Sequence, residues 1–174
     1  MDLQEQLATR IQGNVVIMGI GNPCRGDDAA GSLVARRISD APGVRVIDAQ
    51  DVPEDYLCLV VNQQPNTVVL IDSVDLDSAA GVIALLDKDQ MGGYWPSTHR
   101  VPICLLMNYL ERETHARVFL IGIQPHQTGF LEPMSDEVYS SVARLTDVLN
   151  SVLAVPRMPA QVVFTDPLRR KVPA

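Results

Sequence analysis

Acidic side chains follow the apolar segments of this 174-residue chain, at the points where predicted strands end. Asp28 comes soon after the first segment, Asp48 closes the second, and Asp72 closes the third. Ligands of a parallel α/β sheet bind beyond the carboxyl ends of its strands, so these carboxylates stand where chemistry is expected. Together with His99, Asp28 and Asp72 form an oxygen and nitrogen donor set that suits a divalent transition ion such as nickel or zinc.

Each member of this set also has a purely structural interpretation. Asp27 is a good N-cap for the helix that follows, and Asp28 gains only about 0.3–1 kcal/mol from the helix dipole. Asp72 ends an apolar strand, where an ionised carboxylate is costly unless a cation or hydrogen-bond donors compensate it. His99 lies between a glycine-containing loop and a helix, where a lone histidine is usually just exposed. The residues alone leave a metal site and structural roles both open.

Two glycines in the first turn, Gly19 and Gly21, invite comparison with a dinucleotide-binding loop. The third glycine, Gly26, arrives five residues after Gly21 instead of three, so the spacing does not fit. Asp27 and Asp28 would also repel a phosphate at the helix start, which makes nucleotide binding a weak alternative. The chain lacks the G-x-S-x-G and H-E-x-x-H motifs of common hydrolases, and its cysteines have no local protease signature.

Charge is distributed unevenly along the chain. Fourteen lysines and arginines stand against 21 aspartates and glutamates, a formal charge of −7. Residues 1–154 hold 10 basic and 20 acidic side chains, whereas residues 155–174 hold 4 and 1. We expect one domain over residues 1–154. A basic, proline-containing tail over residues 155–174 follows it and is expected to take no part in catalysis. An acidic domain is a poor nucleic-acid binder and suits a cation or a basic peptide better.

The sequence also predicts a compartment. The first thirteen residues lack the basic start and apolar run of a signal peptide, and no stretch reaches about 18 uninterrupted apolar residues. The three cysteines, Cys24, Cys58 and Cys104, lie too far apart for a zinc motif and indicate no disulfide framework. We expect a reduced, cytoplasmic protein that is not inserted in a membrane.

Short apolar segments alternate with amphipathic segments along the chain. We expect strands at 14–20, 44–49, 67–71, 82–86 and 118–123, and helices at 29–38, 54–61, 102–113 and 135–153. Strands that are apolar throughout are typical of a sheet covered on both faces. The alternation therefore predicts a single α/β domain with a mostly parallel sheet sandwiched between helices.

Five motifs, in order over residues 15–149, make this chain resemble the hydrogenase maturation endopeptidases. They are most similar to the branch that processes the large subunit of formate-hydrogenlyase-type NiFe hydrogenases. The motifs are Gly19-x-Gly21-Asn22 with Gly26-Asp27-Asp28-x-x-Gly31; Val46-Ile47-Asp48 with Pro53-Glu54; Leu70-Ile71-Asp72-x-x-Asp75 with Gly81; Thr98-His99-x-x-Pro102 with Asn108-Tyr109-Leu110; and Gly122-Ile123-Gln124-Pro125 with Gly129-Phe130 and Pro133-Met134. Each motif alone is weak, whereas five in order over most of the chain are specific.

The resemblance implies a twisted five-stranded sheet between helices and a peptidase, aspartic-type by family classification. Such enzymes remove a short C-terminal peptide from the large-subunit precursor once nickel is in place. The resemblance carries the metal-contacting positions over to Asp28, Asp72 and His99, with Asp28 standing where the family often has glutamate. The precursor supplies the nickel, and other divalent ions are expected to occupy the site in vitro.

These roles give specific expectations for the residues. We expect Asp28 and Asp72 to be catalytic, His99 to be a ligand, and Asp48 to be a second candidate for a base or a supporting group. The loop at 88–97 is expected to fold over the precursor. A carboxylate acting as general base on water and an ion polarising the scissile carbonyl are both compatible with this set.

Two other functions compete with proteolysis. A non-proteolytic nickel-binding maturation chaperone would need the same three residues, Asp28, Asp72 and His99. A nucleotide-binding module would instead use the glycine-containing turn. The partner of the protease, and of the chaperone, is the hydrogenase large-subunit precursor. The oligomeric state, the individual hydrogenase and the cleavage sequence stay open.

Overall fold

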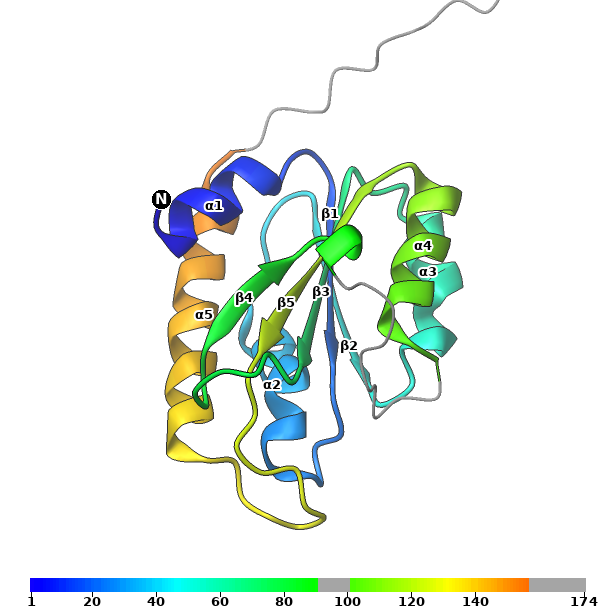
Figure 1. Cartoon of the computed structure of the whole chain (residues 1–174). Coiled ribbons are helices and arrows are strands. Elements are labelled where there is room, and N and C mark those ends of the chain that lie inside the picture. The colour runs from blue at the N-terminus through cyan, green and yellow to red at the C-terminus, as the bar shows by residue number, and fades with distance from the viewer. Residues whose placement is uncertain (91–100, 157–174) are drawn as a thin grey trace, which may run out of the picture.

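A computed structural model describes residues 1–90 and 101–156 of the chain, and five strands form one sheet at its centre (Figure 1). The strands are β1 (Val15–Ile20), β2 (Val44–Gln50), β3 (Thr67–Ser73), β4 (Ile83–Leu86) and β5 (Arg117–Ile123). Their order across the sheet is β2-β1-β3-β5-β4. The pairs β1–β2, β1–β3 and β3–β5 are parallel, whereas β4 runs antiparallel to β5 at one edge. The expectation of a mostly parallel sheet is confirmed.

Helices cover both faces of the sheet. They are α1 (Leu3–Arg10), α2 (Ala30–Arg37), α3 (Leu57–Asn62), α4 (Ile103–Thr114) and α5 (Asp136–Ala154), with short 3-10 turns η1 (Gly26–Ala29), η2 (Pro53–Tyr56) and η3 (Lys88–Gln90). Helices α1, α2 and α5 lie on one face, and α3 and α4 lie on the other (Figure 1). Among the described residues, no helix is both long and apolar enough to cross a membrane.

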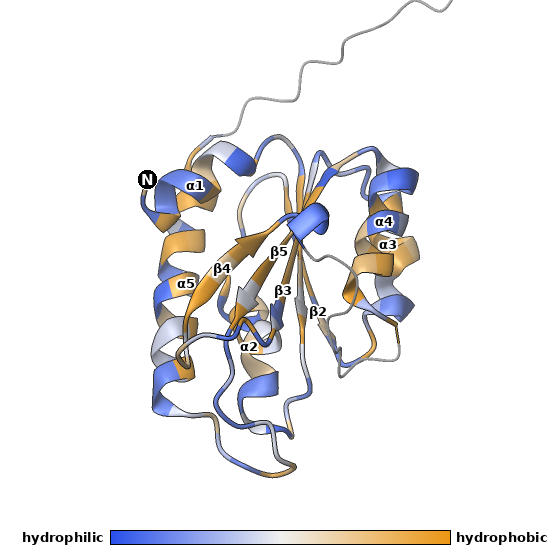
Figure 2. Cartoon of the chain, in the orientation of Figure 1, coloured by the Kyte–Doolittle hydropathy of each residue, from blue (hydrophilic) through white to orange (hydrophobic). Residues whose placement is uncertain are grey.

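Alternation along the strands divides the core into two layers. In β3, Val69 and Ile71 pack with α2 and α5, whereas Val68 and Leu70 pack with α3 and α4. Both sets are buried, so the strand is apolar throughout rather than alternating with polar residues. Figure 2 shows the same arrangement, with apolar strands between helices that carry their hydrophilic residues on the outside.

Several element boundaries differ from those expected from the sequence. Helix α1 was not expected, although Asp2 and Glu5 form a complete capping box at its start. The segment expected to be helical at 54–61 is divided between η2 and α3, because Pro53 begins a 3-10 turn. Strand β3 continues past Ile71 to Ser73, so Asp72 lies within the strand rather than after it.

A close contact of α2 with the sheet positions the first turn. A Cβ on Gly31 would lie 2.0 Å from the backbone oxygen of Ile71, and one on Gly19 would lie 2.2 Å from the oxygen of Gly31. Only glycine permits so close an approach of two backbones. The contact presses the start of α2 against the carboxyl ends of β1 and β3, which brings η1 next to the end of β3.

Candidate functional site

Asp28 lies in η1, between β1 and α2, and is only 2% exposed. One carboxylate oxygen, Oδ2, accepts the backbone N–H of Asn22 at 2.9 Å. The other, Oδ1, accepts the hydroxyl of Ser73 at 3.3 Å. The short turn and the close packing of α2 thus place a buried carboxylate between the ends of β1 and β3.

Asp72, the second predicted carboxylate, is linked to Asp28 by Ser73, which donates a hydrogen bond to each of them. It is 5% exposed, and its Oδ1 accepts the backbone N–H of Ser73 at 2.8 Å. Ser73 therefore donates its hydroxyl to Asp28 and its backbone N–H to Asp72. Because side chains alternate along β3, Asp72 is directed toward the α3 and α4 side and Ser73 toward the α2 side. Both predicted carboxylates thus accept hydrogen bonds from the same residue, at the end of β3.

The third predicted ligand, His99, lies outside the described residues, as does most of the loop at 88–97. Among residues 1–90 and 101–156, no group of three histidine, cysteine, aspartate or glutamate side chains is arranged to hold a metal ion. Two carboxylates from η1 and β3 are in place, and the set needs a further donor to bind a transition ion. The assignment of His99 stays a prediction.

Asp27 does not act as the expected N-cap. Neither η1 nor α2 has a side-chain capping hydrogen bond. The fully buried carboxylate of Asp27 instead accepts the backbone N–H groups of His126, Gln127 and Ser135 at 2.7–3.0 Å, and the Ser135 hydroxyl at 2.9 Å. The N-cap prediction was wrong because the β5–α5 loop, and not the helix that follows Asp27, supplies the donors to this side chain.

Hydrogen bonding sets the protonation of Asp27. Burial alone raises the pKa of this carboxyl, whereas the three backbone N–H groups and the Ser135 hydroxyl lower it, and the net direction is down from 3.8. Hydrogen bonds donated to the charged form favour that form. Asp27 is therefore an ionised, internally satisfied group that attaches the loop at 124–135 to η1.

Asp48 is committed to α2. Its Oδ1 accepts the Ser32 hydroxyl at 2.7 Å, and its Oδ2 pairs with Arg36 Nε at 2.6 Å. The side chain is 23% exposed and lies on the α2 side of the sheet. This arrangement fits a supporting group better than a free base.

The N–H groups of the first turn are used within the protein. Gly21 N–H donates to the Gln50 oxygen, and the following N–H groups donate to nearby oxygens at 2.9–3.1 Å: Asn22 to Asp28, Cys24 and Arg25 to Asn22, Asp27 to Gln127, and Asp28 to Arg25. A phosphate needs such groups to be available. The geometry of this turn does not favour the nucleotide-binding alternative.

Two residues at the same edge of the sheet had no role assigned from the sequence. Gln124, 8% exposed at the end of β5, accepts the N–H groups of Leu76 and Ser78 and donates to Asp75. It holds the β3–β4 loop against β5, and a polar residue directly after an apolar strand is the sequence signal for it. In η2, Glu54 Oε2 is buried and makes no hydrogen bond within the described part of the chain.

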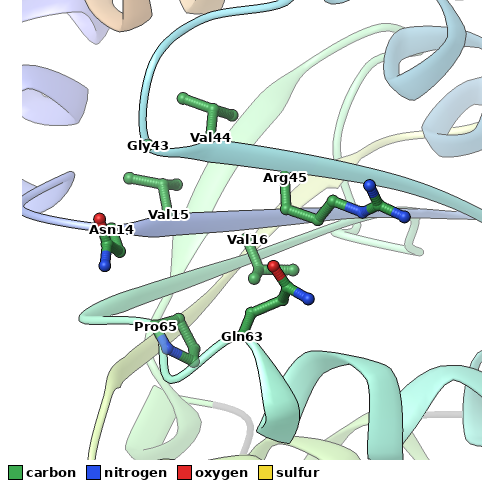
Figure 3. A pocket seen from close by; sticks show the side chains of 8 residues that line it. All are labelled: Asn14, Val15, Val16, Gly43, Val44, Arg45, Gln63 and Pro65. Atoms are coloured by element: carbon green, nitrogen blue, oxygen red, sulfur yellow. The ribbon is translucent and has the colours of Figure 1, made fainter.

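A pocket of about 350 Å³ lies at the opposite edge of the sheet, where β1 and β2 begin (Figure 3). Its lining residues are Asn14, Val15, Val16, Gly43, Val44, Arg45, Gln63 and Pro65. None of them is a candidate from the sequence, and ligands of parallel sheets bind at the carboxyl ends of strands. The candidate site is therefore the edge that carries Asp28 and Asp72.

Comparison with known proteins identifies related chains. The family model described as hydrogenase maturation protease matches residues 30–152. The hydrogenase 3 maturation protease of Escherichia coli K12 is 31% identical over 130 residues, 73% of this chain and 83% of the relative. A putative hydrogenase maturation protease of Methanocaldococcus jannaschii is 28% identical over 87% of this chain and 96% of the relative.

Solved structures agree with these sequence matches. The crystal structure of a NiFe hydrogenase maturation protease from Thermococcus kodakarensis aligns with a TM-score of 0.79 and 30% identity over 87% of this chain and 97% of that chain. The crystal structure of a hydrogenase 3 maturation protease aligns with a TM-score of 0.71 and 28% identity over 82% and 98%. The family match begins two residues after Asp28, so the role of Asp28 rests on its geometry.

Proposed function

Because this chain belongs to the hydrogenase maturation protease family and is a peptidase by that membership, we propose that it removes a C-terminal peptide from the large-subunit precursor of a NiFe hydrogenase. In this proposal the enzyme recognises nickel already held by the precursor. The observation that carries it is the pair of buried carboxylates, Asp28 and Asp72, both of which accept hydrogen bonds from Ser73.

The chemistry of this pair fits a cation supplied by the substrate. Asp28 and Asp72 are buried carboxylates at the same strand end, and a positive ion bound by both offsets the cost of burying their charge. Nickel accepts oxygen and imidazole nitrogen ligands, so His99 completes the proposed set. The scissile bond is positioned only when the nickel-loaded precursor makes these contacts, which links cleavage to prior metal insertion.

The direct test compares nickel-loaded and nickel-free precursor incubated with the purified protein. We expect mass spectrometry to show loss of a C-terminal peptide only from the nickel-loaded form. No mass loss from either form would contradict the proposal and favour a nickel-binding chaperone. Equal cleavage of both forms would keep the peptidase and contradict nickel recognition.

Site variants then assign the roles. Asp28→Asn, Asp72→Asn and His99→Ala are expected to abolish processing without unfolding the protein, since each removes a proposed contact to nickel. Asp77→Asn is the matched control, because Asp77 is an exposed carboxylate after the same strand. Normal processing by any of the first three variants would exclude that residue from the site.

The proposal also covers the organisation of the chain and its setting. We propose that residues 1–154 are the catalytic domain and that the tail at 155–174, of which 157–174 lie outside the described residues, takes no part in catalysis. A chain ending at Pro156 is then expected to process precursor at the wild-type rate. The three cysteines are free thiols, which suits the reducing cytoplasm as the expected setting.

A further inference from the structure

Two large apolar side chains stand side by side on the loop between β5 and α5. Phe130 is 68% exposed and Leu131 is 74% exposed. Leu131 also has a φ of 61°, a left-handed conformation that leucine rarely adopts. A loop that accepts an unfavourable backbone conformation while leaving two apolar side chains in water is typical of a binding element.

Hydrogen bonds hold this loop in one shape. Gly129 N–H donates to Glu132 Oε2 at 2.8 Å, and Gln127 Nε2 donates to the Pro133 oxygen at 2.9 Å. Leu131 N–H donates to the Cys24 oxygen at 2.7 Å. The two apolar side chains are therefore carried on a fixed loop, which reduces the entropy lost on binding a partner.

The same loop is continuous with the candidate site. Cys24 lies in the turn that leads into η1, and Asp27 in η1 accepts N–H groups from both ends of the loop, at His126 and Ser135. Asp28 is the next residue in η1. A partner bound to the loop is thus held next to the carboxylates through a short, hydrogen-bonded connection.

Charge indicates the chemistry of the partner. Residues 118–143 contain no lysine or arginine but three acids, Glu132, Asp136 and Glu137, all of them exposed. Two further exposed apolar side chains, Val52 and Leu105, lie at the same edge, after β2 and in the first turn of α4. A polypeptide with apolar residues and basic neighbours complements this surface.

We propose that Phe130 and Leu131 are the docking surface for an apolar, positively flanked segment of the hydrogenase large-subunit precursor. This inference rests on the proposed function and adds a specificity surface outside the nickel-contacting residues. The surface contributes to precursor affinity and leaves the chemical step unchanged.

The test uses the full-length protein with two variants, Phe130→Ser and Leu131→Asn. We expect KM for the nickel-loaded precursor to rise about tenfold in each, with kcat close to wild type, because apolar area is no longer buried on binding. Asparagine adopts the left-handed conformation more readily than leucine, so Leu131→Asn is expected to melt no lower than wild type. Val155→Ser is the matched control, since Val155 is 62% exposed and directly follows α5, whose C-terminal end lies at the opposite end of the molecule from the β5–α5 loop (Figure 1).

Other outcomes would overturn the inference. Unchanged KM in both variants, with normal processing by wild type, would remove the docking role and leave the proposed function intact. If wild type processes no precursor, the proposed function fails, and titration of precursor against wild type and Phe130→Ser then tests the surface by itself. A dimer in sedimentation that Phe130→Ser dissociates at unchanged KM would assign the surface to a second copy. Removal of residues 157–174 could also lower KM tenfold in the wild-type background but not in Phe130→Ser. That result would assign the surface to the chain's own tail.

Discussion

Asp27 and Ser135 are 108 positions apart in the chain and share two hydrogen bonds. The backbone N–H of Ser135 donates to Asp27 Oδ1 at 2.7 Å, and its hydroxyl donates to Oδ2 at 2.9 Å. Ser135 is the N-cap residue of α5, yet its side chain makes no capping hydrogen bond. The pair therefore joins η1 to the start of α5 and fixes the turn that carries Asp28.

Replacing Asp27 is expected to destabilise the protein. Asp27→Asn removes a buried charge that accepts four hydrogen bonds and introduces an amide nitrogen among donors, which costs about 2–4 kcal/mol of unfolding free energy. Ser135→Ala removes only the hydroxyl and is expected to cost about 1 kcal/mol. Urea denaturation measures both, and equal losses in the two variants would contradict the central role of Asp27.

The same carboxylate predicts a pH dependence of stability. Its folded pKa lies below 3.8, so its stabilising contribution is present above that pH and is lost as the pH falls through the folded pKa. The difference in unfolding free energy between wild type and Asp27→Asn is expected to be constant from about pH 5 to 7 and to shrink below 3.8. Denaturant titrations across this range check it; a difference that grows in acid would give the opposite sign.

Replacing Ser73 tests how strongly processing depends on the hydrogen-bond donor that Asp28 and Asp72 share. Ser73→Ala removes the hydroxyl bonded to Asp28 but keeps the backbone N–H bonded to Asp72. We expect processing to slow by about tenfold, the effect of losing one hydrogen bond to a charged group, with under about 1 kcal/mol of stability lost. Ser73→Thr keeps the hydroxyl and is expected to retain the wild-type rate in the same mass-spectrometric assay.

Replacing Gly31 tests how much the close contact between α2 and the sheet contributes to stability. Alanine there would place Cβ 2.0 Å from the Ile71 oxygen, so α2 must move away from the sheet. We expect a loss of about 2–4 kcal/mol, despite the roughly 1 kcal/mol that alanine gains over glycine in a helix. Gly122→Ala is the control, because its Cβ would meet only side chains at 3.4 Å. Similar melting temperatures for the two variants would show that the contact yields easily.

The sheet was predictable because its determinants are local. The apolar segments around Ile17, Val69 and Leu120 are buried on both faces, and that pattern identifies central parallel strands without knowledge of the partner strands. Helix α1 could also have been found, since its capping box at Asp2 and Glu5 is visible in the sequence. The candidate carboxylates were proposed because they stand at or soon after the ends of apolar segments of the sequence.

The partners of the acids were not predictable in the same way. Asp48 pairs with Arg36 and Ser32, Asp27 with a loop about 100 residues further along, and Asp28 with the end of β3. Capping rules consider only donors within one turn of a helix, so they assigned Asp27 to its own helix. The side-chain direction in a 3-10 turn depends on which distant backbone groups pack against it.

The sequence by itself determined the sheet, its two helical layers, the family and the acidic strand ends, because burial periodicity and motif spacing are properties of short segments. Only the tertiary structure decided that Asp28 and Asp72 are joined through Ser73 and that Asp27 secures the loop bearing Phe130. The physical reason is that these hydrogen bonds join segments far apart in the chain, so their donors and acceptors meet only in the packed fold, in which glycine lets α2 approach the sheet closely.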